Sequence, residues 1–275
     1  KLRGYMITKA IILAAGWGTR RLPITKSVEK CMLPIGNRPV IDYVVQDAIL
    51  AGIKDIYFVV NSEDNQIEKY YKPYPKLEQY LNFAGKPEYL RYIAPPQGVN
   101  FYFIEQEVNT KYGTAIPVGL CFPYIRPGES VAVLTGDDFI YNYDGSSELA
   151  RLIMQTPQGA SSMLSVEVDP NRVGEYGVIE FDTQGNYYQI VEKPSPENSP
   201  SNYINISKYI LNYEVLQAAA AYSKVDITGE YALTEPINQY VLTGGTMKVV
   251  LSQGKYFDSG NAYAWVEANR TVLGV

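Results

Sequence analysis

The stretch LAAGWGTRRLPITKSVEKCMLP, from Leu13 to Pro34, decides the fold of this 275-residue chain. Lys9–Ala15, which overlaps its start, is a short apolar run with β-branched residues, and such a run is typical of a buried strand. Glycines after a strand let backbone N–H groups approach an anion, because they lack a Cβ and tolerate positive φ. Arg20 and Lys30 add two cations beside these glycines. The stretch therefore predicts a strand followed by a phosphate-binding loop.

Two common phosphate-binding motifs do not fit this loop. Arg21 stands where the pattern G-x-G-x-x-G needs its third glycine, and the sequence contains no G-x-x-x-x-G-K-[ST]. What remains is G-x-G-T-R, from Gly16 to Arg20. Two fixed cations beside such a loop could hold a triphosphate and offset charge that builds up in a transition state. Taken alone, the loop could equally be an ordinary turn with solvated basic residues.

Strands and helices alternate through the first half of the chain. Pro39–Ile49 carries apolar residues at helical spacing, and Gly52 is a natural stop for this helix. Asp55–Val60 reads as a second strand. A strand, loop, helix and strand in about fifty residues form a βαβ unit, which predicts a parallel sheet with a right-handed crossover. The alternation continues with strands at 100–105 and 130–138 and helices at 114–122 and 146–156.

The second half of the chain is richer in strand patterns. Beyond Ala160 the predicted strands are 161–168, 176–182, 187–193 and 203–211. Helical patterns return at 213–222 and after Asn261. Both halves together predict an α/β protein in which the second half extends the sheet of the first.

The composition excludes several classes of function. Lys and Arg number 24 against 29 Asp and Glu, so the chain lacks the basic excess typical of nucleic-acid binding. Histidine is absent, which excludes Ser-His, Cys-His and His-metal mechanisms. Cys31 and Cys121 are too few for a disulfide framework, and no apolar run approaches the ~20 residues that span a bilayer. We expect a cytoplasmic protein with neither nucleic-acid nor membrane partners.

Acidic residues end two predicted strands. Asp137 and Asp138 follow the apolar run at 130–138, and Asp258 ends a second run before a helix. Ligands of open parallel sheets bind beyond the carboxyl ends of the strands, where carboxylates commonly hold Mg²⁺ together with phosphate oxygens. The alternative is that these carboxylates cap a turn or a helix, with Asp258 as a helix N-cap.

Several motifs together resemble one family. Residues 14–34 resemble the pattern A-A-G-x-G-T-R-x-L-P-x-T-K…K-x-M-L-P of bacterial UTP–glucose-1-phosphate uridylyltransferases, which are sugar-1-phosphate nucleotidylyltransferases. Residues 61–86 resemble the segment that separates this family from its thymidylyl relatives. EYGVIEFD, VEKP, GEYALTEPI and FDSGN follow in the family's order, so the resemblance covers nearly the whole chain.

The resemblance implies a fold and a division of the chain. The fold would be a Rossmann-like three-layer α/β/α nucleotidyltransferase fold with a mostly parallel central sheet. Residues 6–158 would form the nucleotide-binding part and residues 159–275 the sugar-phosphate-binding part, both on one sheet within a single structural domain.

The resemblance also implies roles for residues around the nucleotide. Arg20 and Lys30 would hold the triphosphate and act in catalysis. Asp137 and Asp258 would bind Mg²⁺, the expected cofactor. Gln106 would read the edge of the base. The full set of implied nucleotide-binding residues is Ala14, Ala15, Gly16, Gly18, Thr19, Gln106 and Gly113.

On the sugar side, Gly177 and Glu192 would bind hexose hydroxyls, and Lys193 would hold the sugar phosphate and act in catalysis. Without the resemblance, Glu192 and Lys193 would be a solvated pair at a strand end. The implied reaction is the Mg²⁺-dependent transfer of a uridylyl group from UTP to glucose 1-phosphate, which gives UDP-glucose and pyrophosphate. Relatives commonly form dimers or tetramers, so self-association is also expected.

Departures from the family pattern leave the substrates open. Seven positions separate Gln106 from Gly113, more than the pattern has, so thymine remains an alternative to uracil. Glu29 replaces the usual proline and Cys31 the usual glutamate, while Ser207–Tyr209 replaces a glycine-arginine-tyrosine pattern near the sugar. A glucose-1-phosphate thymidylyltransferase and a transferase for another sugar 1-phosphate are therefore alternatives. So is a regulatory paralogue that binds nucleotide sugars, although the residues whose loss would mark it are present: Arg20, Lys30, Asp137 and Lys193.

Overall fold

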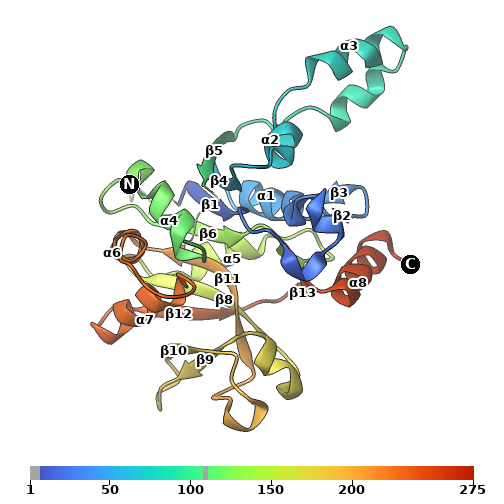
Figure 1. Ribbon diagram of the computed structural model, residues 1–275. Helices are drawn as coiled ribbons and strands as arrows, with labels where there is room; N and C mark the ends of the chain where they lie inside the picture. Colours follow the sequence, from blue (N-terminus) through green and yellow to red (C-terminus); the bar gives the residue numbers. More distant parts are fainter. Residues whose placement is uncertain (1–6, 108–110) are drawn as a thin grey trace.

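The structure is a computed structural model that describes residues 7–107 and 111–275 (Figure 1). Its central feature is a nine-stranded sheet with the order β10-β9-β11-β6-β1-β4-β5, which β8 and β12 join through β11. β10 and β11 run against the direction of the other strands, so the sheet is mostly parallel, as predicted. The strands are β1 (Lys9–Leu13), β4 (Asp55–Asn61), β5 (Asn100–Gln106), β6 (Val131–Thr135), β8 (Ser161–Glu167), β9 (Gly177–Phe181), β10 (Tyr187–Glu192), β11 (Tyr203–Leu211) and β12 (Met247–Leu251).

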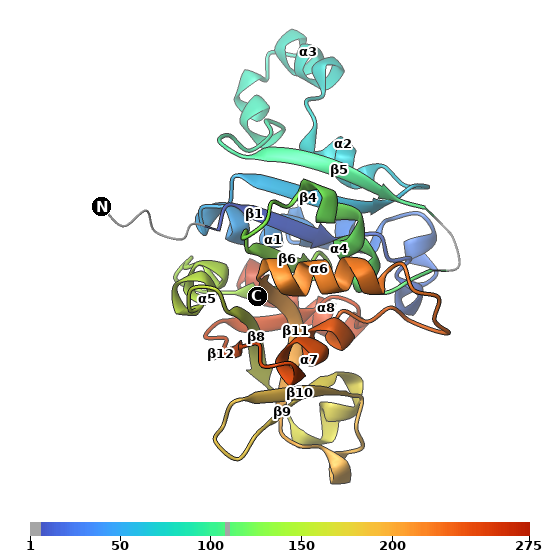
Figure 2. The same ribbon diagram turned by 90° about the vertical axis from the view of Figure 1, so that its left-hand side faces the viewer.

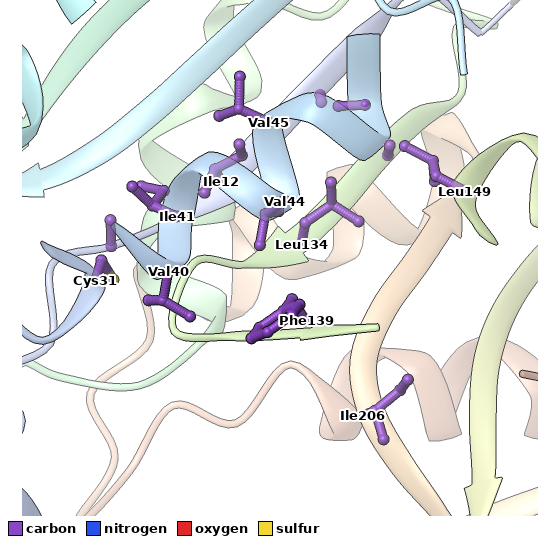
Figure 3. Close-up of a cluster of buried hydrophobic side chains, with 14 of the residues drawn as sticks. Ile12, Cys31, Val40, Ile41, Val44, Val45, Leu134, Phe139, Leu149 and Ile206 are labelled. Carbon is purple, nitrogen blue, oxygen red and sulfur yellow. The ribbon is translucent and has the colours of Figure 1, made fainter. Parts of the chain in front are cut away.

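Helices cover both faces of the sheet and give three layers, as predicted. Successive residues of β1 point to opposite faces: Ile12 packs with α1 in one core cluster, and Ile11 packs with α4 and α6 in the other. Figure 3 shows the first cluster beneath α1, and Figure 2 shows α4 and α6 on the other side. The helices are α1 (Val40–Leu50), α2 (Gln66–Tyr71), α3 (Pro75–Phe83), α4 (Ala115–Cys121), α5 (Glu148–Gln155), α6 (Tyr213–Tyr222), α7 (Thr234–Leu242) and α8 (Ala262–Leu273).

The predicted βαβ unit is confirmed. β1, α1 and β4 follow one another, and β1 pairs in parallel with β4 on one side and with β6 on the other. Because parallel strands end at one edge, Leu13, Thr135 and Gln106 finish on the same side of the sheet. This edge is where the candidate site residues gather.

The prediction of one strand over 130–138 is wrong at its end. β6 stops at Thr135, and the chain bends at Gly136 before β7 (Asp138–Tyr141) leaves the sheet. β7 then pairs antiparallel with β13 (Lys255–Asp258), which sets Asp138 opposite Asp258. The bend is tightly packed, since a Cβ on Gly136 would lie 3.2 Å from Cys31 Sγ. The bend and this pairing therefore bring Asp258 to the end of β6.

An arm that the sequence patterns did not reveal projects from the body. It contains α2, α3 and the 3-10 turn η4 (Pro87–Tyr92), and it extends above the sheet in Figure 1. Glu29 ties the base of the arm to the body, because its Oε1 accepts hydrogen bonds from Gln66 N (2.6 Å) and Ile67 N (3.4 Å). Glu29, a departure from the family pattern, thus has a structural partner.

Neither α7 nor β12 was predicted, and nor were the remaining short elements. They are β2 (Pro34–Ile35), β3 (Arg38–Pro39) and the 3-10 turns η5 (Phe122–Tyr124), η6 (Pro170–Glu175) and η7 (Pro196–Asn198). Across residues 7–107 and 111–275, no helix combines the length and apolar character needed to cross a membrane. Strands from both predicted parts share the sheet, but the division of binding roles at residue 158 stays a prediction, and its start at residue 6 lies outside the described residues.

Candidate active site

The loop after β1 packs closely against the side chain of Lys30. It contains three 3-10 turns, η1 (Thr19–Arg21), η2 (Ile24–Lys26) and η3 (Lys30–Met32). Gly18 is left-handed (φ 67°), and its carbonyl accepts a hydrogen bond from Thr25 Oγ1 at 2.9 Å. A Cβ on Gly16 would lie 2.9 Å from Lys30 Cε, and one on Gly18 would lie 2.8 Å from Lys30 Cβ. Gly18 is therefore required for the close passage of Lys30, whereas Gly16 meets only the flexible end of the lysine side chain.

A cleft of about 390 Å³ opens beside this loop. Its lining comes from the ends of β1, β5 and β6 and from the segment before α4. The predicted residues that line it are Ala15, Gly16, Gly18, Thr19, Lys30, Gln106, Gly113 and Asp137. Ala14 does not line the cleft: it is buried, and its backbone N donates a hydrogen bond to Val59 O within the sheet.

Gln106 stands at the end of β5 with an unpaired polar atom. Its Oε1 is buried and has no hydrogen-bond partner among the described residues. A buried acceptor without a donor destabilises a protein by ~1–3 kcal/mol. The position and the unpaired oxygen fit a group that receives a hydrogen bond from a ligand in the cleft.

Gly113 lines another wall of the cleft and packs against the backbone of Tyr231. Its φ is 121°, and a Cβ there would lie 2.6 Å from the backbone N and O of Tyr231. Tyr231 N donates to Tyr112 O, and Ala115 N donates to Tyr231 O, both at 2.8 Å. This contact brings Glu230 into the cleft lining. Sequence reasoning missed Glu230, although GEYALTEPI was recognised as a motif.

We expect Gly113→Ala to lower the free energy of unfolding by about 2–4 kcal/mol, because it adds both backbone strain and overlap with Tyr231. It should also part the two segments that form this wall of the cleft. Gly128→Ala is the matched control: Gly128 also has positive φ (81°), but no atom lies within 4 Å of the added Cβ. Denaturant unfolding of both variants measures the effect. Equal losses in the two variants would contradict the proposed overlap.

Lys30 and Asp137 form an ion pair in the lining of the cleft. Lys30 Nζ lies 2.7 Å from Asp137 Oδ2. Burial alone would raise the pKa of Asp137, but the charge and hydrogen bond of Lys30 outweigh it and leave this pKa below its usual range. Burial alone would lower the pKa of Lys30, but the nearby charge of Asp137 outweighs it, so this pKa lies above its usual range. Both groups are therefore charged near neutral pH.

Asp258 joins the same cluster from the other end of the chain. Its Oδ2 lies 4.0 Å from Arg20 Nη1, and its Oδ1 accepts a hydrogen bond from Gly260 N at 2.9 Å. Ser259 Oγ donates to the backbone oxygen of Asp137. A second cavity of about 180 Å³ is lined by both Arg20 and Lys30, together with Asp137. The loop cations and the two predicted metal ligands thus gather at one place.

Asp258 is not the N-cap of the helix that follows. The cap of α8 is Asn261, whose side chain accepts hydrogen bonds from Tyr263 N (2.9 Å) and Ala264 N (3.4 Å). The helix N-cap alternative is therefore wrong for Asp258, although its carboxylate caps the turn before α8 by accepting the hydrogen bond from Gly260 N.

The acids present suit a magnesium ion that is shared with a ligand. Within the described parts of the chain, no three His, Cys, Asp or Glu side chains form a metal-binding group. Mg²⁺ at nucleotide sites usually takes only one or two carboxylates, with phosphate oxygens and waters completing its shell. Asp137 and Asp258, which Ser259 holds together, provide two such carboxylates. Their role as metal ligands stays a prediction.

The predicted sugar residues lie on the β9–β10 hairpin. Gly177 and Glu192 face each other in register, and a Cβ on Gly177 would lie 3.1 Å from Glu192 Oε1. The pKa of Glu192 is raised, first by burial and then by the nearby charge of Glu230. Glu230 lines the cleft described above, whereas Glu192 does not.

Lys193 is adjacent to this pair but outside both cavities described above. It is exposed, its φ is 46°, and its backbone N donates to Tyr176 O at 2.9 Å. In the part of the chain that the structure describes, its ammonium forms no hydrogen bond or ion pair. The structure thus brings Gly177 and Glu192 together, whereas Lys193 lines neither of the cavities to which Arg20 and Lys30 contribute.

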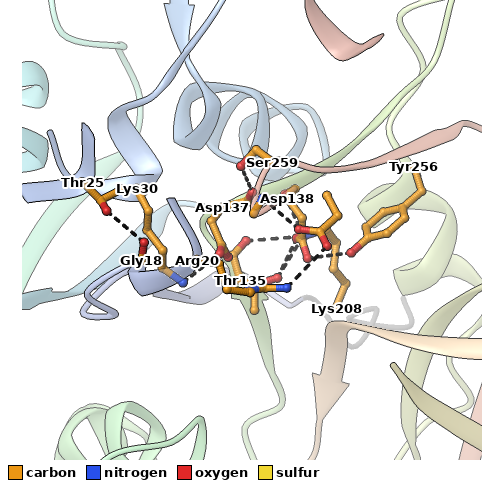
Figure 4. A network of polar contacts seen from close by, with 12 residues as sticks. Gly18, Arg20, Thr25, Lys30, Thr135, Asp137, Asp138, Lys208, Tyr256 and Ser259 are labelled. Carbon is orange, nitrogen blue, oxygen red and sulfur yellow. Dashed lines mark hydrogen bonds and ion pairs between the residues drawn. The ribbon is translucent and has the colours of Figure 1, made fainter. Parts of the chain in front are cut away.

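Asp138 points away from the cleft. It is buried, and its carboxylate is bound by Lys208, Thr135 and Tyr256 (Figure 4). Lys208 was noted only as a departure from the family pattern, so sequence reasoning missed its contact with this acid. Asp138 is a structural carboxylate in this arrangement.

Comparisons with known proteins agree on one family. Residues 9–274 match the nucleotidyl transferase family. The chain is 32% identical to a UTP–glucose-1-phosphate uridylyltransferase from Pseudomonas aeruginosa over 269 residues, which cover 96% of this chain and 95% of that protein.

Solved structures show the same likeness. The structure matches the UDP-glucose pyrophosphorylase of Acinetobacter baumannii with a TM-score of 0.86 and 29% identity, over 97% of this chain and 93% of the other. A UTP-bound UGPase from the same organism matches with a TM-score of 0.85 and 27% identity, at the same coverage.

Proposed function

The chain belongs to the nucleotidyl transferase family, and on that basis we propose that it transfers a uridylyl group from UTP to glucose 1-phosphate, with Mg²⁺, to give UDP-glucose and pyrophosphate. One observation carries the proposal: the Lys30–Asp137 pair lies beside the glycine loop, in the same cleft as Gln106. A nucleotide whose base meets Gln106 would have its phosphates at the loop. The named relatives and the UTP-bound neighbour support the same activity.

The chemistry requires charge neutralisation more than proton transfer. Both substrates are anions, and the attacking phosphate oxygen is already ionised near neutral pH, so no general base is needed. Arg20 and Lys30 would offset the charge on the departing pyrophosphate. Mg²⁺ held by Asp137 and Asp258 would supply further neutralisation between the two phosphate groups. A chain without histidine can therefore carry out this reaction.

In this proposal the ammonium of Lys30 would contact both Asp137 and the triphosphate. Its side chain crosses Gly16 and Gly18 before reaching Asp137. The ammonium therefore stands between the glycine loop and the acid. A triphosphate seated on the loop would lie within reach of the same ammonium, which could contact both groups because it has three donors.

Lys193 would hold the sugar phosphate, while Glu192 and Gly177 would contact the hexose. We expect Lys193→Ala to raise the KM for glucose 1-phosphate at least about tenfold, since a charge-assisted hydrogen bond contributes ~1.5–3 kcal/mol. The KM for UTP should change little. The fold should be retained, because the side chain is exposed and the segment is anchored through a backbone bond to Tyr176.

Lys248→Ala is the control for this variant, because Lys248 is an exposed lysine on β12 of the same sheet. Steady-state pyrophosphate release with each substrate varied in turn measures both KM values. An unchanged KM for glucose 1-phosphate in Lys193→Ala would remove Lys193 from the sugar site.

The identity of base and hexose needs a substrate panel. Gln106 Oε1 can accept a hydrogen bond from the N3–H of uracil or of thymine, so it does not separate the two. Residues 108–110, which carry part of the unusual spacing to Gly113, lie outside the described residues. Pyrophosphate release from UTP and dTTP with several sugar 1-phosphates would decide. Faster turnover of dTTP would favour the thymidylyltransferase alternative, and binding of UDP-glucose without turnover of any pair would favour the regulatory paralogue.

Self-association into a dimer or tetramer and a cytoplasmic location remain predictions from the resemblance and the composition. Light scattering of the purified protein would measure the first.

A further inference from the structure

Lys208 is a buried lysine on β11 whose ammonium reaches the bend between β6 and β7. Its backbone pairs with Leu134 of β6, and only 3% of the residue is exposed. Nζ donates to Asp138 Oδ1 at 2.6 Å and to the backbone oxygens of Asp138 (3.2 Å) and Thr135 (3.3 Å). Figure 4 shows this contact next to the Lys30–Asp137 pair. The three donors of one ammonium thus connect both ends of the bend that contains Asp137.

The carboxylate of Asp138 has partners on both oxygens. Oδ1 also accepts a hydrogen bond from Thr135 Oγ1 at 2.6 Å, and Oδ2 accepts one from Tyr256 OH at 3.0 Å. Tyr256 belongs to β13, the strand that ends at Asp258. The Lys208 network therefore touches β6, the bend and the strand that carries the second predicted metal ligand.

A bulge in β11 aims Lys208 at the bend. Pairing with β8 shifts between Asn205 and Tyr209, which leaves extra residues on β11. Ser207 takes the left-handed conformation (φ 52°), and its backbone N donates to Asn205 Oδ1 at 3.0 Å. Asn205 Nδ2 in turn donates to Tyr209 OH at 2.6 Å. Bulges re-aim side chains, and this one has its own hydrogen bonds to hold it.

We propose that Lys208 is a positioning residue: by binding the Asp138 carboxylate and the backbone oxygens at both ends of the bend, it fixes Asp137 toward Lys30 and the cleft. Two adjacent carboxylates repel each other, and here each has its own cation, so they diverge. This inference rests on the proposed function, because it concerns how the same site is held. Lys208 itself lines neither cavity of that site.

The first test compares Lys208→Met with Lys208→Arg. Methionine removes the charge and keeps most of the volume, and loss of a supporting partner typically lowers metal affinity or activity by 10–100-fold. We expect a fall of that size in kcat for Lys208→Met, with a much smaller change in the KM for glucose 1-phosphate. Arginine retains the charge and should restore activity to within about tenfold of the unmodified protein. Lys248→Met is the matched exposed control.

Lys208→Met could fail to fold, because it leaves Asp138 buried without its cation. The decisive variant is therefore Lys208→Met with Asp138→Asn, which removes both charges. If Lys208 only compensates the buried charge of Asp138, the double variant should recover near-normal kcat, and the positioning role would be overturned. If Lys208 positions Asp137, the double variant should fold, by circular dichroism and thermal unfolding, and remain 10–100-fold less active.

A metal titration separates this inference from the proposed function. Mn²⁺ binding followed by electron paramagnetic resonance in the presence of UTP reports the site without turnover. We expect the double variant to bind Mn²⁺ 10–100-fold more weakly than the unmodified protein. Absence of turnover in the unmodified protein would contradict the proposed function alone. Equal Mn²⁺ affinity in the two proteins would contradict the positioning role.

Discussion

Asp137→Asn is expected to lower kcat/KM by at least about 10³-fold at saturating Mg²⁺, because the charge stabilisation that a bound metal ion gives a transition state is worth several kcal/mol. Asparagine keeps the shape and can still accept the hydrogen bond from Lys30, but it removes the charge that would hold the metal. Pyrophosphate release at a series of Mg²⁺ concentrations measures the effect.

Asp144→Asn is the matched control for this prediction. Asp144 is an exposed aspartate just beyond β7. Its carboxylate accepts a local hydrogen bond from Ser146 N, which is 2 residues further along the chain. It should retain normal turnover. Thermal unfolding of both variants checks that the fold is intact. Unchanged turnover in a folded Asp137→Asn protein would move the metal site elsewhere.

Lys30→Met is expected to lower kcat/KM for UTP by about 10²–10³-fold, the usual effect of removing one group that stabilises developing charge. The KM for glucose 1-phosphate should change much less, because the side chain crosses the glycine loop and not the β9–β10 hairpin. Lys26→Met is the control, since Lys26 is an exposed lysine at the end of η2 in the same loop.

The double variant Lys30→Met with Asp137→Asn distinguishes two roles of Lys30. Lys30 and Asp137 are in contact, and the effects of substituting two residues in contact are usually not additive in a double-mutant cycle. If Lys30 served only to pair with Asp137, it would add no loss once Asp137 is neutral. A further fall in kcat/KM for UTP would show a separate contribution from Lys30, in line with contact to the triphosphate.

The strands and the phosphate-loop position could be predicted because their signals are local. The apolar run Lys9–Ala15 and the helical spacing in Pro39–Ile49 correspond to β1 and α1 within two residues at each end. Such periodicities follow from side-chain directions along strands and helices. The arm with α2 and α3 gave a weak signal because these helices are short and bury few residues, such as Ile67 and Leu81.

The bend after β6 could not be predicted from its own residues. An apolar run followed by a glycine and two acids looks the same whether the strand continues or turns. Gly136 turns because it packs against Cys31 and Leu13, which belong to other segments. The same distant packing explains why two neighbouring aspartates differ: Asp137 meets Lys30 and Asp138 meets Lys208.

The sequence by itself determined the mostly parallel α/β sheet, the glycine loop after the first strand and the residue types available for chemistry, since these depend on periodicity, backbone freedom and composition. Only the tertiary structure decided which acid faces the cleft and which cation each acid meets. Lys30 and Asp137 are 107 residues apart in the chain, and Lys208 and Asp138 are 70 apart. Contacts at such separations exist only once the sheet order and the bends at strand ends have brought the segments together.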